Sequence, residues 1–556
     1  MKNCLIGAVL LCATVSAEEF SDQQLGQDPK LTSIVLNHDR FAEVEARLKS
    51  FINFENPEQG TYPSIAFQIQ TKHDSFLKFY GFRDIAQRKP VNENTLYRLA
   101  SMAKPVVAVS ALILYERGYF YLNQPVSTFL PDFAQEKMKV IDLVSPSSTF
   151  TLINSITTEA GSSVVTIRAP SHDMHVNDRI GIKSDDKVGN LELNGTFTVT
   201  NIPTIDSFQV TTIGKATSTE TLQGGVIAID LLPHPDTLSL DEPKIGKRFY
   251  YHLVPLNKKL TLKHLLTHTS GYGDSNMTTR LGETMIQKSY ANQAGLPDSL
   301  SNYYAADMTL EELTHKMSTV PLMFQPGEDW SYGQGYNILG AAISAIDPKK
   351  RDLARFQQEE IFDKLEMNDT FYFVSDTDPR RAEWLDNVHV LYEKVNGTWQ
   401  PSKNAAQMSA FIGPRKFILP GAGLMSTVPD YIKFMTMLSN LGLSETGVRI
   451  LSPTTVRFAA ENQIGSMGVK GFPDEGFAAY TATKFGLGWG VEDESMPTEI
   501  KTPNILYWAG VWKTFFLVDI ERNITTSTWL NTDQATVPSE LWLLEDIGFS
   551  LIIPQD

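Results

Sequence analysis

A β-rich stretch in the middle of the chain limits how the rest can fold. Residues 141–232 are rich in Ser, Thr, Val and Ile, in short runs that alternate between apolar and polar residues, such as SVVTIRA and GTFTVTNI. Turn residues separate these runs roughly every eight to twelve positions, which is typical of a small all-β module. Helical patterns stand on both sides of it. The sequence therefore predicts one discontinuous domain, 36–140 with 233–556, into which residues 141–232 are inserted.

The flanking segments combine helices with strands. Residues 40–53 place apolar side chains on one face of a helix, whereas residues 64–82 alternate like two strands around a turn. Residues 101–118 are expected to form a long apolar helix that ends at a glycine, a residue that favours helix C-termini. Late strands are predicted within 505–531, and residues 540–553 are expected to form a closing helix beside the first one. The expected fold class of the main domain is α+β with an antiparallel sheet flanked by helices.

The first residues resemble a targeting segment. Residues 1–17 combine a basic start, a short apolar run and small residues before a cleavage point after Ala17, which is the pattern of a secretory signal peptide. Both cysteines, Cys4 and Cys12, lie in this segment, so the mature chain would carry no disulfide. We therefore expect a protein that is secreted to the extracellular space, or to the periplasm in a bacterium.

Charge and hydropathy limit the partners that this chain can have. Its formal net charge is −16, which argues against the basic face that a nucleic-acid partner requires. No later apolar run is long enough for a bilayer, so no transmembrane segment is expected. The inserted β module is a candidate for contact with a partner or a glycan, and the alternative is that it is a tolerated surface insertion.

The motif Ser-x-x-Lys occurs three times, at 75–78, 101–104 and 184–187. The first lies in a predicted strand, where residues three apart point to opposite faces. The third lies in the β-rich insert beside two aspartates, which would keep its lysine protonated. Only Ser101 opens a predicted helix, where Lys104 shares its face and can reach its hydroxyl. This context singles out Ser101 and Lys104.

The surroundings of this pair suit nucleophilic catalysis. The N-terminus of a helix supplies a positive field that favours an oxyanion beside Ser101. Apolar neighbours such as Val106 and Val107 would desolvate Lys104 and lower its pKa, which a lysine base requires. The alternative is that Ser101 is only a helix cap and Lys104 a surface lysine.

Five segments resemble, in order, those of serine β-lactamases, penicillin-binding proteins and their class C-like esterase relatives. They are LASMAKPVVAVSALILYERG, LTLKHLLTHTSGY, FQPGEDWSYGQGYNILGAAIS, PGAGLMSTVPDYIKFMTML and YWAGVWKTFFLVDIE. The resemblance implies a β-lactamase/transpeptidase-like fold, in which a helical subdomain accompanies the sheet. The β insert is not part of the family pattern.

The resemblance also implies roles for single residues. Tyr332, in Trp-Ser-Tyr-Gly-Gln, would be a second base that moves a proton between Ser101, Lys104 and the leaving group. The backbone N–H groups of Ser101 and Val511 would form an oxyanion hole. This chemistry needs no metal and no organic cofactor.

Two departures from the family pattern concern the substrate. The Tyr-x-Asn motif ends in Gln334 here, and the Lys-Thr-Gly triplet of the strand is replaced by Trp508, Ala509 and Gly510, which resemble the Trp-Gly-Gly of the esterase branch. These four residues are the predicted substrate-binding positions. Loss of the strand lysine favours an uncharged ester or amide over a β-lactam. Lys513 begins a near-match, but it lies three residues late and lacks the glycine.

Several functions remain possible at this level. A small ester or amide would be hydrolysed through an acyl-enzyme on Ser101, by an esterase, a D-amino-acid peptidase or a β-lactamase-like enzyme, and an acyltransferase would use the same residues. The alternative from another class is a catalytically inactive binding protein that uses the β insert for a partner or a polysaccharide. His264 and His268 stand four apart like zinc ligands, but without an intervening glutamate or a third ligand a structural role is favoured. No Gly-x-Ser-x-Gly elbow occurs, which disfavours an α/β-hydrolase.

Overall fold

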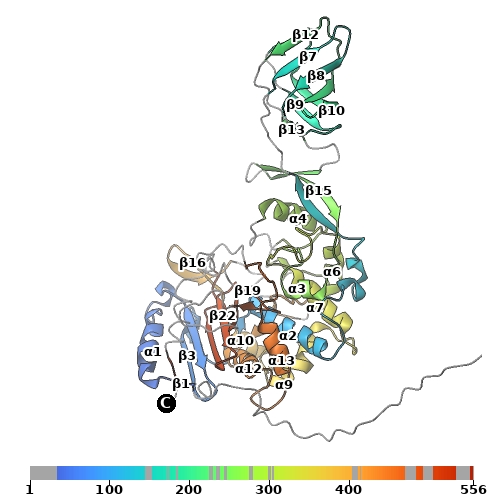
Figure 1. Ribbon diagram of the computed structural model, residues 1–556. Coiled ribbons are helices and arrows are strands. Elements are labelled where there is room, and N and C mark those ends of the chain that lie inside the picture. Colours follow the sequence, from blue (N-terminus) through green and yellow to red (C-terminus); the bar gives the residue numbers. More distant parts are fainter. Residues whose placement is uncertain are drawn as a thin grey trace, which may run out of the picture.

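The computed structural model describes most of the chain after its first 33 residues (Figure 1). The described ranges are 34–144, 153–170, 172, 174–182, 186–223, 230–232, 238–242, 247–273, 280–298, 302–303, 306–403, 411–413, 415–469, 484–492, 505–533 and 551–554. The predicted signal peptide, 1–17, and most of the predicted closing helix, 540–553, lie outside them.

An eight-stranded antiparallel sheet forms the centre of the main domain. Its strands, in spatial order, are β19 (Lys484–Phe485), β20 (Gly490–Val491), β21 (Ile505–Gly510), β22 (Thr514–Asp519), β23 (Ile524–Trp529), β2 (Ser64–Gln70), β3 (Ser75–Asp84) and β4 (Lys89–Pro90). The early hairpin β2–β3 thus lies beside the late strands, with Ala66 opposite Trp529. This pairing joins the two ends of the domain across the whole sequence.

Helices cover both faces of the sheet. The helices are α1 (Phe41–Ser50), α2 (Ala103–Glu116), α3 (Leu262–Leu266), α4 (Leu281–Gln293), α6 (Leu310–Ser318), α7 (Gly335–Ile346), α8 (Leu353–Gln357), α9 (Asp363–Leu365), α10 (Arg381–Asn387), α12 (Val428–Ser439) and α13 (Pro453–Ala460). None of those in the described part of the chain has the length and hydropathy that a bilayer span requires. The α+β class predicted from the sequence is confirmed.

The two faces of the sheet are built by the alternation of side chains along each strand. Ile65 and Phe67 of β2 pack in one cluster with Leu48 of α1. Ala66, between them, belongs to the opposite cluster, which includes Val107 of α2. The predicted helix over 40–53 and the predicted hairpin over 64–82 are therefore confirmed, and so is the apolar helix after Ser101.

The chain ends of the main domain lie side by side. Strand β1 (Ile34–Leu36) pairs with β24 (Ile552–Pro554), so the last residues of the predicted closing helix form a strand instead. Short ladders complete the domain: β5 (Tyr97–Arg98) with β18 (Met425–Ser426), and β16 (Tyr392–Val395) with β17 (Thr398–Pro401). A short apolar run fits the pattern of a buried strand as well as that of a helix, so the sequence alone does not distinguish the two at this chain end.

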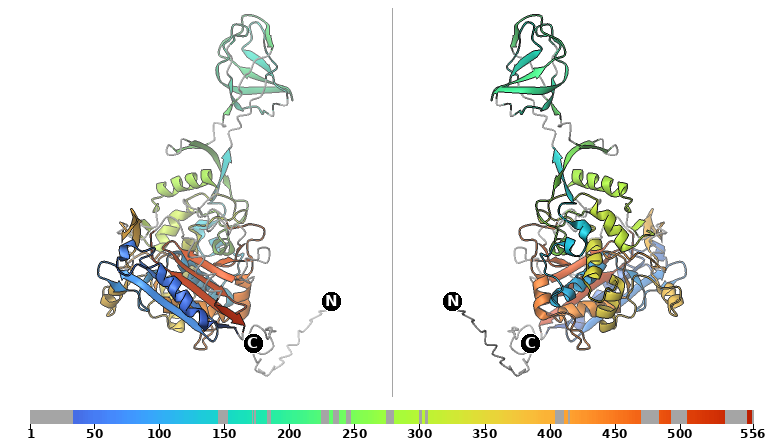
Figure 2. Two further views of the ribbon diagram at one scale, coloured as in Figure 1. Left: turned by 90° about the vertical axis from the view of Figure 1, so that its left-hand side faces the viewer. Right: turned by 90° about the vertical axis from the view of Figure 1, so that its right-hand side faces the viewer.

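A three-stranded stalk leaves the main domain beside α4 (Figure 2). It consists of β6 (Lys139–Val144), β15 (Lys247–Pro255) and β14 (Leu238–Glu242), with β15 in the middle. Along β6 and β15, Lys139 lies opposite Pro255 and Val144 opposite Tyr250. The chain therefore departs and returns at neighbouring points.

Helix α4 is packed tightly against this stalk. Its Ile286 shares a buried cluster with Ile141 of β6 and Tyr251 of β15. The backbone of α4 comes close to the stalk at Gly282, where a Cβ would lie 2.8 Å from a methyl group of Leu143. The stalk and α4 thus form one packed unit.

Beyond the stalk, a seven-stranded sheet stands away from the main body (Figure 1). Its strands, in spatial order, are β12 (Glu220–Gln223), β7 (Ser155–Thr158), β8 (Val164–Arg168), β11 (Ser207–Thr211), β10 (Gly195–Thr204), β9 (Arg179–Ile182) and β13 (Asp230–Leu232). A separate apolar cluster fills it, with Ile167, Phe208 and Val210 fully buried. We call this unit the β module.

The β module, produced alone as residues 145–237, is expected to fold. Its core contains no side chain of the main domain among the described residues, so removal of that domain takes away no core contact. We expect cooperative thermal unfolding with a stability on the order of 5 kcal/mol, from roughly 0.05 kcal/mol per residue. Circular dichroism melting checks this. A non-cooperative melt would show that the module depends on the main domain.

Candidate active site

The segment that carries Ser101 is held in an unusual backbone conformation. Ser101 lies in a short 3-10 turn, Ala100–Met102, which runs directly into α2. The alanine before it has a φ of +46°, a left-handed conformation that costs a non-glycine residue about 1–2 kcal/mol. The turn is held in place on both sides: Leu99 N–H donates to the carbonyl of Leu424, and Thr514 Oγ1 donates to the carbonyl of Leu99 at 3.2 Å. The surrounding structure therefore fixes the direction of the Ser101 side chain.

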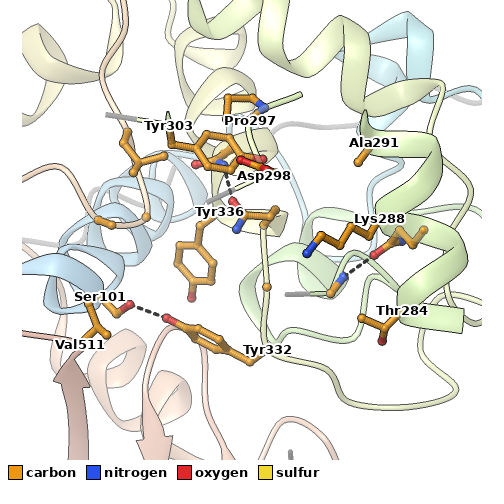
Figure 3. Close-up of a pocket in the computed structure, with 18 of the residues that line it drawn as sticks. Ser101, Thr284, Lys288, Ala291, Pro297, Asp298, Tyr303, Tyr332, Tyr336 and Val511 are labelled. Carbon is orange, nitrogen blue, oxygen red and sulfur yellow. Dashed lines mark hydrogen bonds between the residues drawn. The ribbon is translucent and has the colours of Figure 1, made fainter. Parts of the chain in front are cut away.

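Three predicted residues meet at one oxygen atom. Lys104 Nζ donates to Ser101 Oγ at 3.1 Å, and Tyr332 Oη donates to the same atom at 2.5 Å (Figure 3). Lys104 lies one helical turn after Ser101, as the spacing predicts, whereas Tyr332 comes from the loop before α7. Two groups able to accept a proton thus contact one hydroxyl.

Lys104 is buried, with 6% of its surface exposed. Its ammonium group donates to the carbonyl of Gly421 at 2.9 Å and lies 4.6 Å from the centroid of the Tyr332 ring. Gly421 belongs to the Gly-rich turn PGAGL, so this segment holds the lysine in place.

His268 lies beneath the site and is neutral. Its ring is fully buried and lies 4.7 Å from the ring of Tyr332, and burial, together with the charge of Lys104, holds its pKa well below the usual range. His264 closes a capping box with Thr261, and burial lowers its pKa to about 4. The two histidines therefore have structural roles, His264 in capping α3 and His268 in packing against Tyr332. The described residues contain no group of three or more potential metal ligands.

The end of β21 comes unusually close to the Ser101 turn. A Cβ at Gly510 would lie 2.3 Å from the carbonyl oxygen of Leu99 and 2.4 Å from Thr514 Oγ1, so only glycine fits. Val511, next in sequence, is partly exposed and lines the same cavity as Ser101. The two residues predicted to form the oxyanion hole are thus brought together (Figure 3).

Replacing Gly510 with alanine is expected to lower activity, because the strand end or the Ser101 turn must shift to admit the Cβ. We expect kcat to fall about tenfold to a hundredfold, since even a small displacement of catalytic groups is costly. Steady-state kinetics with a chromogenic ester checks this. Gly214→Ala is the control, because a Cβ there meets only a Leu191 methyl group, at 3.3 Å. Equal activity of the Gly510 variant and wild type would contradict the prediction.

The other predicted substrate-binding residues differ in their surroundings. Gln334 lines the cavity, and its side-chain oxygen accepts a hydrogen bond from Asn337 at 2.8 Å. Trp508 is buried instead, with its ring 5.6 Å from that of Tyr332, and neither it nor Ala509 is among the cavity-lining residues. Trp508 thus backs the tyrosine rather than facing the cavity.

The remaining lysine motifs lie elsewhere. Ser75 opens strand β3, and Lys78 contacts Glu45 at 3.8 Å on the outer side of the sheet. Ser184 lies outside the described residues. Lys513, from the near-match, is buried and does not line the cavity.

The cavity over Ser101 has a volume of about 230 Å³. One wall is α4, which was not singled out in the sequence, with Thr284, Gln287, Lys288 and Ala291 facing inward. Their spacing of three, four and seven residues is that of one face of a helix, and this spacing is the sequence feature that indicates a shared face. Gly333 lies against Gly273 so closely that a Cβ would come within 2.4 Å of that residue, which brings the loop of Tyr332 against the segment before α4.

Comparisons with known proteins show which sequences and folds this chain resembles. The family model described as Beta-lactamase matches residues 50–163 and 236–547. Protein Rv1367c of Mycobacterium tuberculosis is 30% identical over 389 residues, which are 69% of this chain and 63% of that protein, and thus under two thirds of its length. Lovastatin esterase of Penicillium rubens is 27% identical over 219 residues, 38% of this chain and 46% of that enzyme.

Solved structures share the fold. Simvastatin synthase (LovD) from Aspergillus terreus superposes with a TM-score of 0.57 at 16% identity, covering 91% of this chain and 96% of that one. EstCE1, described as a hydrolase with promiscuous acyltransferase activity, gives 0.56 at 15% identity, covering 91% and 98%. At these identities the likeness concerns the fold alone.

Proposed function

Because this chain belongs to the Beta-lactamase family, we propose that it is a serine hydrolase that forms an acyl-enzyme on Ser101. The observation that carries the proposal is the convergence of Lys104 Nζ and Tyr332 Oη on Ser101 Oγ, at 3.1 and 2.5 Å. A serine hydroxyl is a weak nucleophile until a base takes its proton. Here two candidate bases contact it.

The reaction then proceeds in two halves. Ser101 Oγ attacks the substrate carbonyl while its proton passes to Lys104 or Tyr332, and the N–H groups of Ser101 and Val511 stabilise the oxyanion. Tyr332 returns a proton to the leaving group as the C–O or C–N bond breaks. Water, deprotonated by the same groups, then attacks the acyl-enzyme and releases the acid.

A small ester or amide is the proposed substrate. The strand position that holds a lysine suited to a β-lactam carboxylate in the family pattern holds the buried Trp508 here, which favours the esterase branch. Two relatives bear names in keeping with ester chemistry, lovastatin esterase and esterase EstB of Burkholderia gladioli.

Acyl transfer to an alcohol is the second candidate, and it uses the same acyl-enzyme. It is favoured by the relative named acyltransferase calJ, from Penicillium decumbens, which is 25% identical over 296 residues. Product analysis with added alcohols separates the two, since a transferase yields a new ester rather than the free acid. An inactive binding protein is disfavoured because Ser101, Lys104 and Tyr332 keep a complete hydrogen-bonded arrangement.

The test is covalent labelling of the wild-type protein with a fluorophosphonate, beside turnover of p-nitrophenyl acetate. We expect turnover and one added phosphonyl group, which mass spectrometry of peptides assigns to Ser101. Absence of both turnover and labelling in folded protein would overturn the hydrolase and transferase proposals and favour the binding protein. Labelling of another serine would refute the assignment of Ser101.

A further inference from the structure

Lys288 projects from α4 into the cavity that contains Ser101 (Figure 3). It shares the inward face of this helix with Thr284 and Ala291. Its side chain is half-buried. A cationic group therefore lines the cavity from the helical wall, apart from the Ser101–Lys104 pair.

The base of this side chain is held firmly. The neighbouring Gln287 is buried, and its amide donates to the carbonyls of Gly271 and Pro321 at 2.9 and 2.8 Å. Its oxygen accepts from Gly273 N at 3.0 Å. The opposite face of α4 packs on the stalk through Ile286. The cation is thus positioned by a fixed helix rather than by a loose surface segment.

Three charged residues line the cavity in the described part of the chain: Lys104, Lys288 and Asp298. Lys104 is engaged by Ser101 and Gly421. Asp298 is exposed, accepts a hydrogen bond from Asn302 at 2.5 Å and lies on the side of Tyr303 in Figure 3. Within the described residues, no carboxylate lies within ion-pair distance of Lys288. A half-buried ammonium group with no counter-charge among the described residues attracts an anion from outside.

We propose that Lys288 binds a carboxylate on the substrate, so that the preferred ester or amide carries one negative charge away from the scissile carbonyl. This inference rests on the proposed function and narrows its substrate class. The sequence favoured an uncharged substrate because the strand lysine is missing. The structure instead supplies a lysine from the facing helical wall. The carboxylate belongs either to the acyl part or to the alcohol part of the substrate, and in both cases the ammonium group of Lys288 would bind it.

Two matched ester pairs test the proposal on the full-length protein. The acyl pair is the p-nitrophenyl monoester of glutaric acid and p-nitrophenyl pentanoate, and the alcohol pair is 4-acetoxybenzoate and its methyl ester. The values of kcat/KM are measured for wild type, Lys288→Met and Lys288→Arg. Lys72→Met is the control, because it removes the same charge from an exposed turn between β2 and β3.

We expect Lys288→Met to lower kcat/KM about tenfold for the carboxylate ester of one pair, mainly through KM, and to change its neutral partner less than about twofold. Lys288→Arg should retain most of the preference, and Lys72→Met all of it. The pair that responds identifies the side of the substrate that carries the charge. Equal losses on charged and neutral esters, or no loss on either, would overturn the inference while the hydrolase proposal stands.

A binding measurement tests the contact between Lys288 and the carboxylate without requiring turnover. The mono-4-nitroanilide of glutaric acid is titrated by calorimetry into Ser101→Ala protein, with and without Lys288→Met. Weaker binding to the double variant by about tenfold is expected, whereas equal affinity would contradict carboxylate recognition on the acyl side. Failure of the proposed function would give a different result: the wild-type protein would neither hydrolyse a neutral ester nor react with a fluorophosphonate.

Discussion

Ser101→Ala is expected to lower kcat for p-nitrophenyl acetate by about 10⁴-fold or more, and to abolish labelling by a fluorophosphonate. The reason is that Ser101 Oγ is the atom on which Lys104 and Tyr332 converge, so its loss removes the acyl-enzyme route altogether. Only the slower catalysis due to the oxyanion hole and substrate binding would remain. Stopped-flow or steady-state release of p-nitrophenol gives the rate.

The matched control is Ser75→Ala, in a second Ser-x-x-Lys motif of the same chain. Ser75 is exposed at the start of β3 and does not line the cavity, so activity should stay at the wild-type level. A Ser101 variant that retains more than about a tenth of the wild-type rate would contradict the assignment of the nucleophile.

Lys104→Met is expected to lower kcat about 10³-fold or more, and to slow labelling of Ser101 by a similar factor. Methionine preserves the length and apolar packing of the side chain beside Tyr332 and Tyr336, but it removes the amine that contacts Ser101 Oγ. Proton removal by a positioned base contributes typically 10²–10⁴-fold. The loss should appear in kcat rather than in KM, because the amine acts on the nucleophile.

Lys78→Met, in the Ser75 motif, is the parallel control and should leave both rates unchanged. Thermal unfolding of Lys104→Met monitors the fold, because this variant also leaves the Gly421 carbonyl without the hydrogen bond from Lys104. A folded Lys104 variant with kcat near wild type would show that Tyr332 alone suffices as base.

Local patterns along the chain predicted those parts of the fold that depend on nearby residues. The α1 helix, the β2–β3 hairpin and the late strands follow from apolar periodicity, and all three are present. The pairing of Ser101 with Lys104 follows from helix geometry alone. These features could be predicted because each is decided within one or two turns of chain.

Features that arise from close approach between distant segments could not be predicted in this way. Gly510 lies against Leu99, and Gly333 against Gly273, but a single glycine gives no sign of which backbone it meets. Helix α4 faces a cavity on one side and the stalk on the other, so polar and apolar residues occur on both sides and blur its pattern. Only the assembled structure shows that Lys288 faces Ser101.

The register of the stalk bears on how so divided a chain can fold. Because Val144 lies directly opposite Tyr250, the two halves of the main domain are separated by a strand spacing rather than by the length of the intervening chain. Closing a loop costs entropy that grows with its length, and contacts far apart in sequence slow folding. A β module that folds first from its own local contacts removes most of this cost before the halves meet. We therefore expect the folded β module to hold the two halves of the main domain close together while that domain folds.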